Sequence, residues 1–167
     1  MGWQVLILDL GSVSCLASCA RGRPLELVLF FSGLEAPSGV LRLMGIPSVV
    51  LLCSDISAPS SAISNYYNPD VIHLGDVWGI EEDALPAVDL VLLGPLCQPF
   101  STLVTNRTEV DPRAGLFARG CQLATATRAP LSIVEEVRTI LRGKCCQYWK
   151  AGLRLLRKAG YQVSWNV

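Results

Sequence analysis

The sequence predicts an α/β protein with a doubly wound, mostly parallel sheet and helices on both faces of that sheet. The chain has 167 residues, which is enough for one domain with a substantial core. Its Val, Ile and Leu residues come in short continuous runs, as is typical of strands that are buried on both faces. Helix-compatible stretches alternate with these runs, and this alternation indicates βαβ units.

The predicted elements follow one another along the chain. The strands are expected at residues 27–31, 48–53, 71–74, 88–93 and 131–134, with helices at 38–44, 58–66 and 119–128. A longer amphipathic helix is expected at 145–158, closed by Gly160 and followed by a strand from Tyr161. The polar stretch 103–112 is expected to be a surface loop. Residues 1–24 form a segment of unknown role, and one domain is expected over 25–167.

Composition restricts the class of protein. With 51% hydrophobic and 17% charged residues, the chain is not a disordered tail, and its apolar runs are too short for a membrane span. The net charge is 0, so charge alone does not predict nucleic-acid binding. The 7 cysteines fit neither common zinc spacing, so no metal site is expected. Their odd number indicates reduced thiols inside a cell. The expected location is the nucleus if the protein is eukaryotic and the cytoplasm if it is bacterial or viral.

Three strand ends carry residues suited to a nucleoside ligand. Phe31-Ser32-Gly33 ends the first strand, where the backbone can approach a ligand closely. Asp55 follows the second strand, where α/β folds commonly bind ribose hydroxyls, and Asp76 follows the third, near an adenine amino group. Each acid alone is more often a helix cap or a loop residue. Together, the three positions favour a nucleoside cofactor bound without a phosphate-cradling loop.

Two further residues suit chemistry. Cys97 lies between prolines after the fourth strand, where a nucleophile would face the ligand edge. An arbitrary free cysteine is more often a small buried apolar residue, but none of the other six has this setting. Glu135 follows the fifth strand and could protonate a substrate ring. The alternative is a solvated glutamate pair, Glu135 and Glu136, at a helix start.

The order of these motifs resembles the cytosine-5 DNA methyltransferase family from about Leu27 onward. The turn Phe31-Ser32-Gly33 looks like its first cofactor motif, Asp55 like its ribose acid, and Gly75-Asp76-Val77 like its adenine motif. The stretch 94–101 is similar to its nucleophile loop, and 111–117 to its Asp-x-Arg-x-x-Leu-Phe element. Glu135-Glu136-Val137 falls where the family has Glu-Asn-Val.

The resemblance implies a Rossmann-like fold that binds S-adenosylmethionine and methylates C5 of a cytosine in DNA. Cys97 would add as a thiolate to C6 of a flipped-out base, and Glu135 would assist at N3. The cofactor-binding residues it implies are Phe31, Ser32, Gly33, Asp55, Ile56, Asp76, Val77, Pro95 and Leu116.

The sequence departs from the family pattern at several points. Leu96 replaces the proline before the nucleophile, Glu35 stands where many members have a second glycine, and Glu136 replaces an asparagine. A second carboxylate beside Glu135 is expected to raise the apparent pKa values of the pair. The family's arginine motif, DNA-recognition region and C-terminal helix have no counterpart before Val167. The chain is therefore expected to form half of an active site, with DNA bound through a complementing part or subunit.

Two alternatives stay open at this point. The chain could be a truncated or degenerate family member that binds only a cofactor or a methyltransferase partner. Transfer RNA could also replace DNA as the substrate, because no polymer-reading region is recognisable.

Overall fold

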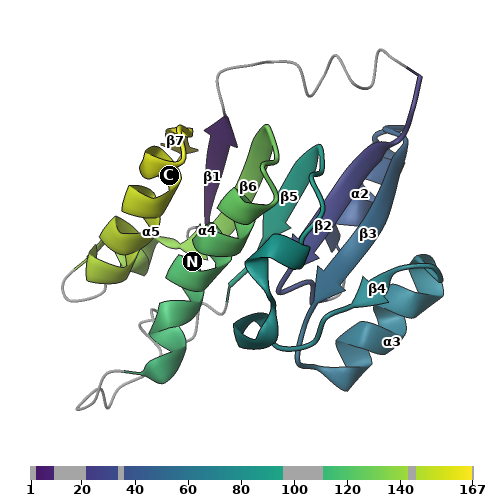
Figure 1. Cartoon of the computed structure of the whole chain (residues 1–167), viewed down its shortest axis with the longest axis horizontal. Coiled ribbons are helices and arrows are strands. Elements are labelled where there is room, and N and C mark those ends of the chain that lie inside the picture. The colour runs from purple at the N-terminus through teal and green to yellow at the C-terminus, as the bar shows by residue number, and fades with distance from the viewer. Residues whose placement is uncertain (1–2, 10–21, 34–35, 96–110, 143–145, 167) are drawn as a thin grey trace.

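The computed structural model describes residues 3–9, 22–33, 36–95, 111–142 and 146–166. Its centre is a seven-stranded sheet with the order β4-β3-β2-β5-β6-β1-β7 (Figure 1). The strands are β1 (Trp3–Asp9), β2 (Leu25–Phe30), β3 (Ser48–Ser54), β4 (Ile72–His73), β5 (Leu90–Leu93), β6 (Leu131–Val137) and β7 (Gln162–Asn166). Strands β2 to β6 pair in parallel, whereas β1 runs antiparallel to both β6 and β7.

Helices cover both faces of the sheet, which confirms the predicted fold class. They are α2 (Ala36–Leu43), α3 (Ala58–Tyr67), α4 (Leu116–Ala126) and α5 (Cys146–Lys158). In Figure 1, α4 and α5 lie in front of the strands and α2 lies behind them. None of the helices in the described ranges is long and apolar enough to cross a membrane.

Strand β2 is continuously apolar from Leu27 to Phe30, and its position in the sheet explains why. Val28 and Phe30 belong to the core under α4 and α5, whereas Leu27 and Leu29 belong to the core on the α2 side. All four side chains are at most 1% exposed. Successive side chains of a strand point to opposite faces, so a strand covered on both sides needs an apolar residue at every position.

The helices on the front face pack closely because of a glycine. A Cβ atom at Gly152 of α5 would overlap the ring of Phe117 in α4 and would lie 2.9 Å from the sulfur of Cys121. The Phe117 ring stacks on Trp149 of α5, with ring centroids 5.5 Å apart. Gly152 is therefore the contact point at which the two helices approach each other.

Some boundaries differ from those that the sequence predicted. Strand β4 has two residues, β5 begins at Leu90, and α4 begins at Leu116, directly after the 3-10 turn η3 (Pro112–Gly115). Strand β6 continues through Val137, so Glu135 and Glu136 lie inside it and do not start a helix. The reason is β1, which pairs with β6 from Leu131 to Val137, whereas β5 pairs only as far as Val134. This strand comes from the segment to which the sequence assigned no role.

Candidate functional site

The turns that leave β2, β3, β4 and β5 lie side by side at one edge of the sheet and are hydrogen-bonded to one another. The Ser32 amide donates to the Ser54 carbonyl (3.0 Å), and the Leu74 amide donates to the Cys53 carbonyl (2.9 Å). The Gly94 amide donates to the Phe30 carbonyl at 3.3 Å. Carboxyl ends of parallel strands are where open α/β sheets bind ligands.

The first turn has an unusual backbone that its neighbours hold in place. Phe31 has a φ of 59°, a left-handed conformation that bulky residues rarely adopt. Asp55 fixes the same turn from β3, because its Oδ2 accepts the Gly33 amide and its Oδ1 accepts the Ser57 amide, both at 2.8 Å. The aspartate predicted from the sequence is therefore brought directly to the predicted Phe-Ser-Gly turn. Strained residues of this kind cluster at ligand sites.

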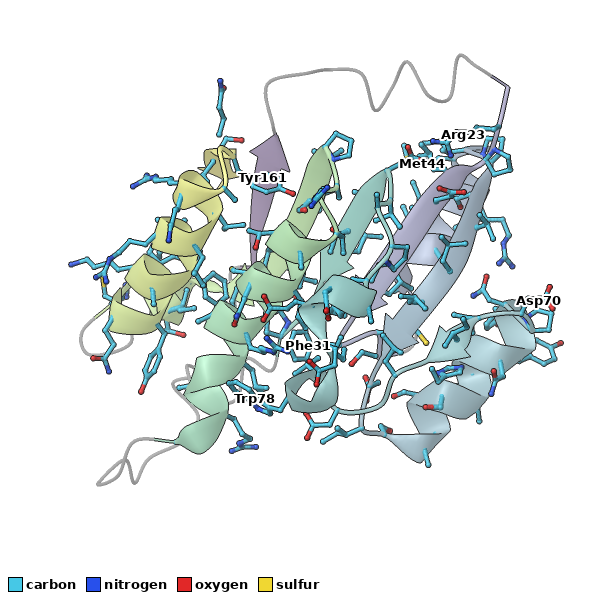
Figure 2. The ribbon with its side chains drawn as sticks, in the orientation of Figure 1. Arg23, Phe31, Met44, Asp70, Trp78 and Tyr161 are labelled. Atoms are coloured by element: carbon cyan, nitrogen blue, oxygen red, sulfur yellow. The ribbon has the colours of Figure 1, made fainter. Side chains whose placement is uncertain are left out.

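The third turn is held in a similar way. The Ser54 hydroxyl donates to the Gly75 carbonyl at 2.6 Å, and the Asp76 carboxylate accepts the Trp78 amide at 3.0 Å. Asp76 is exposed, whereas Val77 is 3% exposed and belongs to the core. Figure 2 shows Phe31 and Trp78 toward the same end of the sheet.

Arg119 of α4 is hydrogen-bonded to the segment after Asp76. Sequence analysis did not identify this residue. Its guanidinium donates to the carbonyls of Val77 (3.1 Å) and Ile80 (2.6 Å) and to the carboxylate of Glu82 (2.7 Å). The side chain is 9% exposed. In the sequence it was one cation within a predicted helix, and its partners lie about 40 residues earlier, so no local signal was available.

A cavity of about 440 Å³ opens at this edge, between the ends of β2, β5 and β6 and the start of α2. Its lining residues are Leu29, Phe30, Phe31, Ser32, Ala36, Pro37, Leu92, Leu93, Gly94, Ile133 and Glu135. The Ser32 hydroxyl and Oε1 of Glu135 are buried there without a hydrogen-bond partner in the described part of the chain. Buried polar atoms are rarely left unsatisfied, so these two oxygens are candidates to hydrogen-bond a polar ligand.

The two glutamates of β6 point to opposite faces of the sheet. Glu135 lines the cavity, whereas Glu136 is 1% exposed on the side of α4 and α5. Burial raises the pKa of Glu135, and it raises the pKa of Glu136 to about 8. From the sequence, a raised pKa was expected because two like charges are adjacent. Burial is the larger cause for Glu136, and the charge of Glu135 adds to it.

The remaining predicted residues have different surroundings. Ile56 is 77% exposed beside Asp55, and Leu116 is 9% exposed at the start of α4. Pro95 is buried directly after Gly94. Cys97, Leu96, Glu35 and most of the expected surface loop lie outside the described residues. Ala36 and Pro37 line the cavity although the sequence did not assign them to it; a proline in the first turn of a helix was the available signal.

Comparisons with known proteins identify methyltransferases. The family model described as C-5 cytosine-specific DNA methylase matches residues 30–167. The chain is 27% identical over 93 residues to the type II methyltransferase M.NgoBI of Neisseria gonorrhoeae, an alignment covering 56% of this chain and 29% of the relative. It is 31% identical over 97 residues to the type II methyltransferase M.HgiCII of Herpetosiphon aurantiacus, covering 57% and 21%. The alignments thus span less than a third of each curated relative.

Two solved structures share the fold. One is the Dnmt2 methyltransferase of S. pombe, with a TM-score of 0.55 and 20% identity over 79% of this chain and 40% of that one. The other is a prophage-encoded E. coli protein described as a DNA modification methyltransferase, with a TM-score of 0.64 and 20% identity over 80% and 38%. The Rossmann-like methyltransferase fold is therefore shown.

Proposed function

The chain belongs to the C-5 cytosine-specific DNA methylase family, and on that premise we propose that it forms the cofactor-binding and nucleophile-bearing part of a DNA cytosine-5 methyltransferase. The observation that carries the proposal is the cavity at the carboxyl ends of β2, β5 and β6. It combines the strained turn at Phe31 with two buried oxygens, on Ser32 and Glu135, that have no partner in the described residues. The parts that read DNA are assigned to a complementing segment or subunit.

The residues at this edge fit S-adenosylmethionine. The Ser32 hydroxyl can bond a polar group of the cofactor in the cavity. Asp55 and Asp76 follow β3 and β4, where carboxylates can accept ribose hydroxyls and an adenine amino group. The Ser54–Gly75 and Gly33–Asp55 hydrogen bonds fix these turns relative to one another. When bound there, S-adenosylmethionine supplies an electrophilic methyl group on a sulfonium.

The proposed chemistry uses Cys97 and Glu135. The Cys97 thiolate adds to C6 of a flipped-out cytosine, because C5 is a poor nucleophile until that addition makes the ring enamine-like. Glu135 donates a proton toward N3 as negative charge develops there, and burial favours the protonated form that this step requires. C5 then takes the methyl group, which leaves S-adenosylhomocysteine as the co-product. A water molecule accepts the C5 proton, the Cys97–C6 bond breaks to regenerate the thiolate, and N3 returns its proton to Glu135.

A trapping experiment tests the nucleophile. DNA containing 5-fluorocytosine should trap the Cys97 adduct, because fluorine cannot leave as a proton does. The chain is mixed with S-adenosylmethionine and the C-terminal part of M.HgiCII as the complementing half. We expect the adduct with the parent chain and with a Cys146→Ser control, and its absence in Cys97→Ser. An adduct that persists in Cys97→Ser rejects the assignment. A 5-fluorocytosine RNA stem-loop run in parallel tests RNA as the substrate.

Cofactor binding is expected to depend on the complementing half. A site that encloses only part of its ligand loses buried contact area, so the chain alone should bind S-adenosylmethionine weakly. Calorimetry should show a tighter dissociation constant when the C-terminal part is added, and a weaker one in Asp55→Ala. Tight binding to the chain alone, or an unchanged affinity in Asp55→Ala, contradicts this assignment.

The buried Glu136 favours a second candidate, a non-catalytic family member that binds cofactor or a partner. Its Oε1 is buried without a partner in the described residues, at a position where the family has asparagine. The double variant Leu96→Pro/Glu136→Asn distinguishes the two functions. Adduct formation that appears only in this variant identifies the natural chain as a disabled enzyme, whereas an adduct already present in the parent identifies it as active.

A further inference from the structure

The net charge is zero, but the acidic and basic residues are unevenly distributed along the chain. Beyond Glu136 the sequence contains no Asp or Glu, yet it holds seven of the chain's 14 Lys and Arg residues. Four of these seven are on α5, and two, Arg138 and Arg142, are on or directly after the 3-10 turn η4 (Arg138–Leu141). All six are exposed. The C-terminal part of the domain is therefore uniformly positive.

The cations of α5 share one side of the helix. Lys150, Arg154, Arg157 and Lys158 have the spacing i, i+4, i+7 and i+8, which places them on one stripe. The adjacent side of the helix packs Trp149, Leu153 and Leu156 into the core. Figure 2 shows side chains with nitrogen atoms projecting from the outer side of α5, away from the sheet. No ion pair to a carboxylate involves this stripe within the described ranges.

Helix stability explains only part of this pattern. Cations in the last turn, such as Arg157 and Lys158, interact favourably with the helix dipole. Lys150 and Arg154 lie before that turn, and α5 has no acid in its first turn to balance them. Like charges four residues apart, as in Lys150/Arg154 and Arg154/Lys158, destabilise a helix. A surface whose charges oppose the stability of its own helix points to an external anion.

The basic surface begins next to the candidate site. The turn η4 follows β6 directly, so Arg138 is three residues after Glu135. The same turn packs against α5. The positive side chains therefore extend from the site edge along the flank of the domain. From Lys150 to Lys158 the stripe covers about 12 Å of helix, a length over which one nucleic-acid strand presents several phosphates.

We propose that the exposed basic side chains of α5 and η4 bind the phosphate backbone of a nucleic acid, outside the cavity that takes the cofactor. The choice of nucleic acid as the polyanion rests on the proposed function, whose substrate is DNA. This surface reads no sequence, because phosphate contacts give affinity and orientation without base recognition. It allows the chain to bind the nucleic acid without a recognition region supplied by a complementing part.

The salt dependence of binding tests this proposal with the full 167-residue chain. Anisotropy of a labelled duplex of arbitrary sequence is measured between 50 and 200 mM KCl, the range over which phosphate contacts are lost (about one slope unit per contact). We expect Arg154→Gln to lower the slope of log K against log[salt] by about 1, and Lys150→Gln/Arg154→Gln by about 2. The control Arg42→Gln removes an exposed cation on α2, over Tyr67, and should leave the slope unchanged. Circular dichroism confirms that the variants are folded.

Each outcome decides the proposal. Low salt favours phosphate contacts, so the proposal is overturned if the parent chain does not bind duplex at about 50 mM KCl. It is also overturned if the double variant and Arg42→Gln show the same slope of log K against log[salt]. Binding to phosphatidylserine vesicles without binding to duplex would identify a lipid surface instead. Cys97→Ser separates this surface from the proposed reaction. If Cys97→Ser keeps the parent's slope of log K against log[salt] but no longer forms the trapped adduct, the result supports both the phosphate-binding surface and the proposed reaction. An adduct that persists in Cys97→Ser rejects the reaction alone.

Discussion

The protonation state of Glu136 depends strongly on the fold. Its carboxyl is 1% exposed, accepts the Val137 amide at 2.6 Å through Oε2, and has a pKa raised to about 8 by burial. The unfolded chain releases this proton near pH 4.5, whereas the folded chain keeps it until about pH 8. The folded state thus holds more protons within that window, so this residue makes the free energy of unfolding fall as the pH rises.

We therefore expect Glu136→Gln to be more stable than the parent at pH 8 and similar to it below pH 4.5. A glutamine keeps an oxygen for the Val137 amide but has no charge to bury. Because one pKa unit corresponds to about 1.4 kcal/mol, the gain at pH 8 should reach a few kcal/mol. Urea unfolding at pH 4, 6 and 8 measures it, and parallel curves for the two proteins would contradict the assigned burial.

Ser32 is expected to separate stability from ligand binding. Its hydroxyl is buried without a partner in the described residues, so Ser32→Ala removes an unsatisfied polar atom. The free energy of unfolding should stay equal or rise by about 1 kcal/mol. If the hydroxyl bonds the cofactor, the affinity for S-adenosylmethionine should fall in the complemented protein. Calorimetry beside urea unfolding measures both, and a variant that loses stability while keeping its affinity refutes this role.

At the scale of the elements, the close approach of α4 and α5 predicts opposite effects for the same substitution in two helices. Alanine forms helices better than glycine by about 1 kcal/mol. At Gly39 of α2, an added Cβ meets nothing within 4 Å, so Gly39→Ala should stabilise the protein by about 0.5–1 kcal/mol.

At Gly152 the added methyl would overlap Phe117 and crowd Cys121, so Gly152→Ala should destabilise by about 1–3 kcal/mol. Thermal unfolding compares the two variants. If both changes stabilise the protein, α4 and α5 do not approach each other as described.

Sequence patterns predicted the elements whose signals are local. The apolar runs identified the buried parts of β2, β3 and β5, because a strand covered on both faces is apolar where it is buried, and the position of Asp55 followed from the end of β3. Asp76 was placed after the run 71–74, which the structure forms only as the two-residue strand β4. The limits of β6 could not be predicted, because its last residues pair with β1, more than 120 residues earlier in the chain. That pairing also decides that Glu135 and Glu136 face opposite sides. The hydrogen bonds of Arg119 depend equally on distant partners.

The whole molecule depends on β1 in a way that links the N-terminus to the candidate site. β1 lies between β6 and β7, and it is the only strand paired with either Glu135–Val137 of β6 or β7 in the described sheet. Without β1, both segments would present unpaired backbone groups, which are costly where they are buried. The position of Glu135 at the cavity should therefore require residues 3–9.

Deletion of residues 1–9 tests this dependence. We expect the free energy of unfolding to fall by several kcal/mol, because the register pairs of β1 with both neighbours are lost. Hydrogen exchange should accelerate at Glu135, Glu136 and Val137, while the amides of β2 and β3, which pair away from β1, stay protected. A synthetic peptide of residues 1–12 added to the truncated chain should restore protection at Glu135–Val137, and a peptide with the same residues in scrambled order should not. Unchanged exchange at Glu135–Val137 after the deletion would show that β1 does not hold this end of β6, and that Glu135 is positioned by β5 and the packing of the sheet alone.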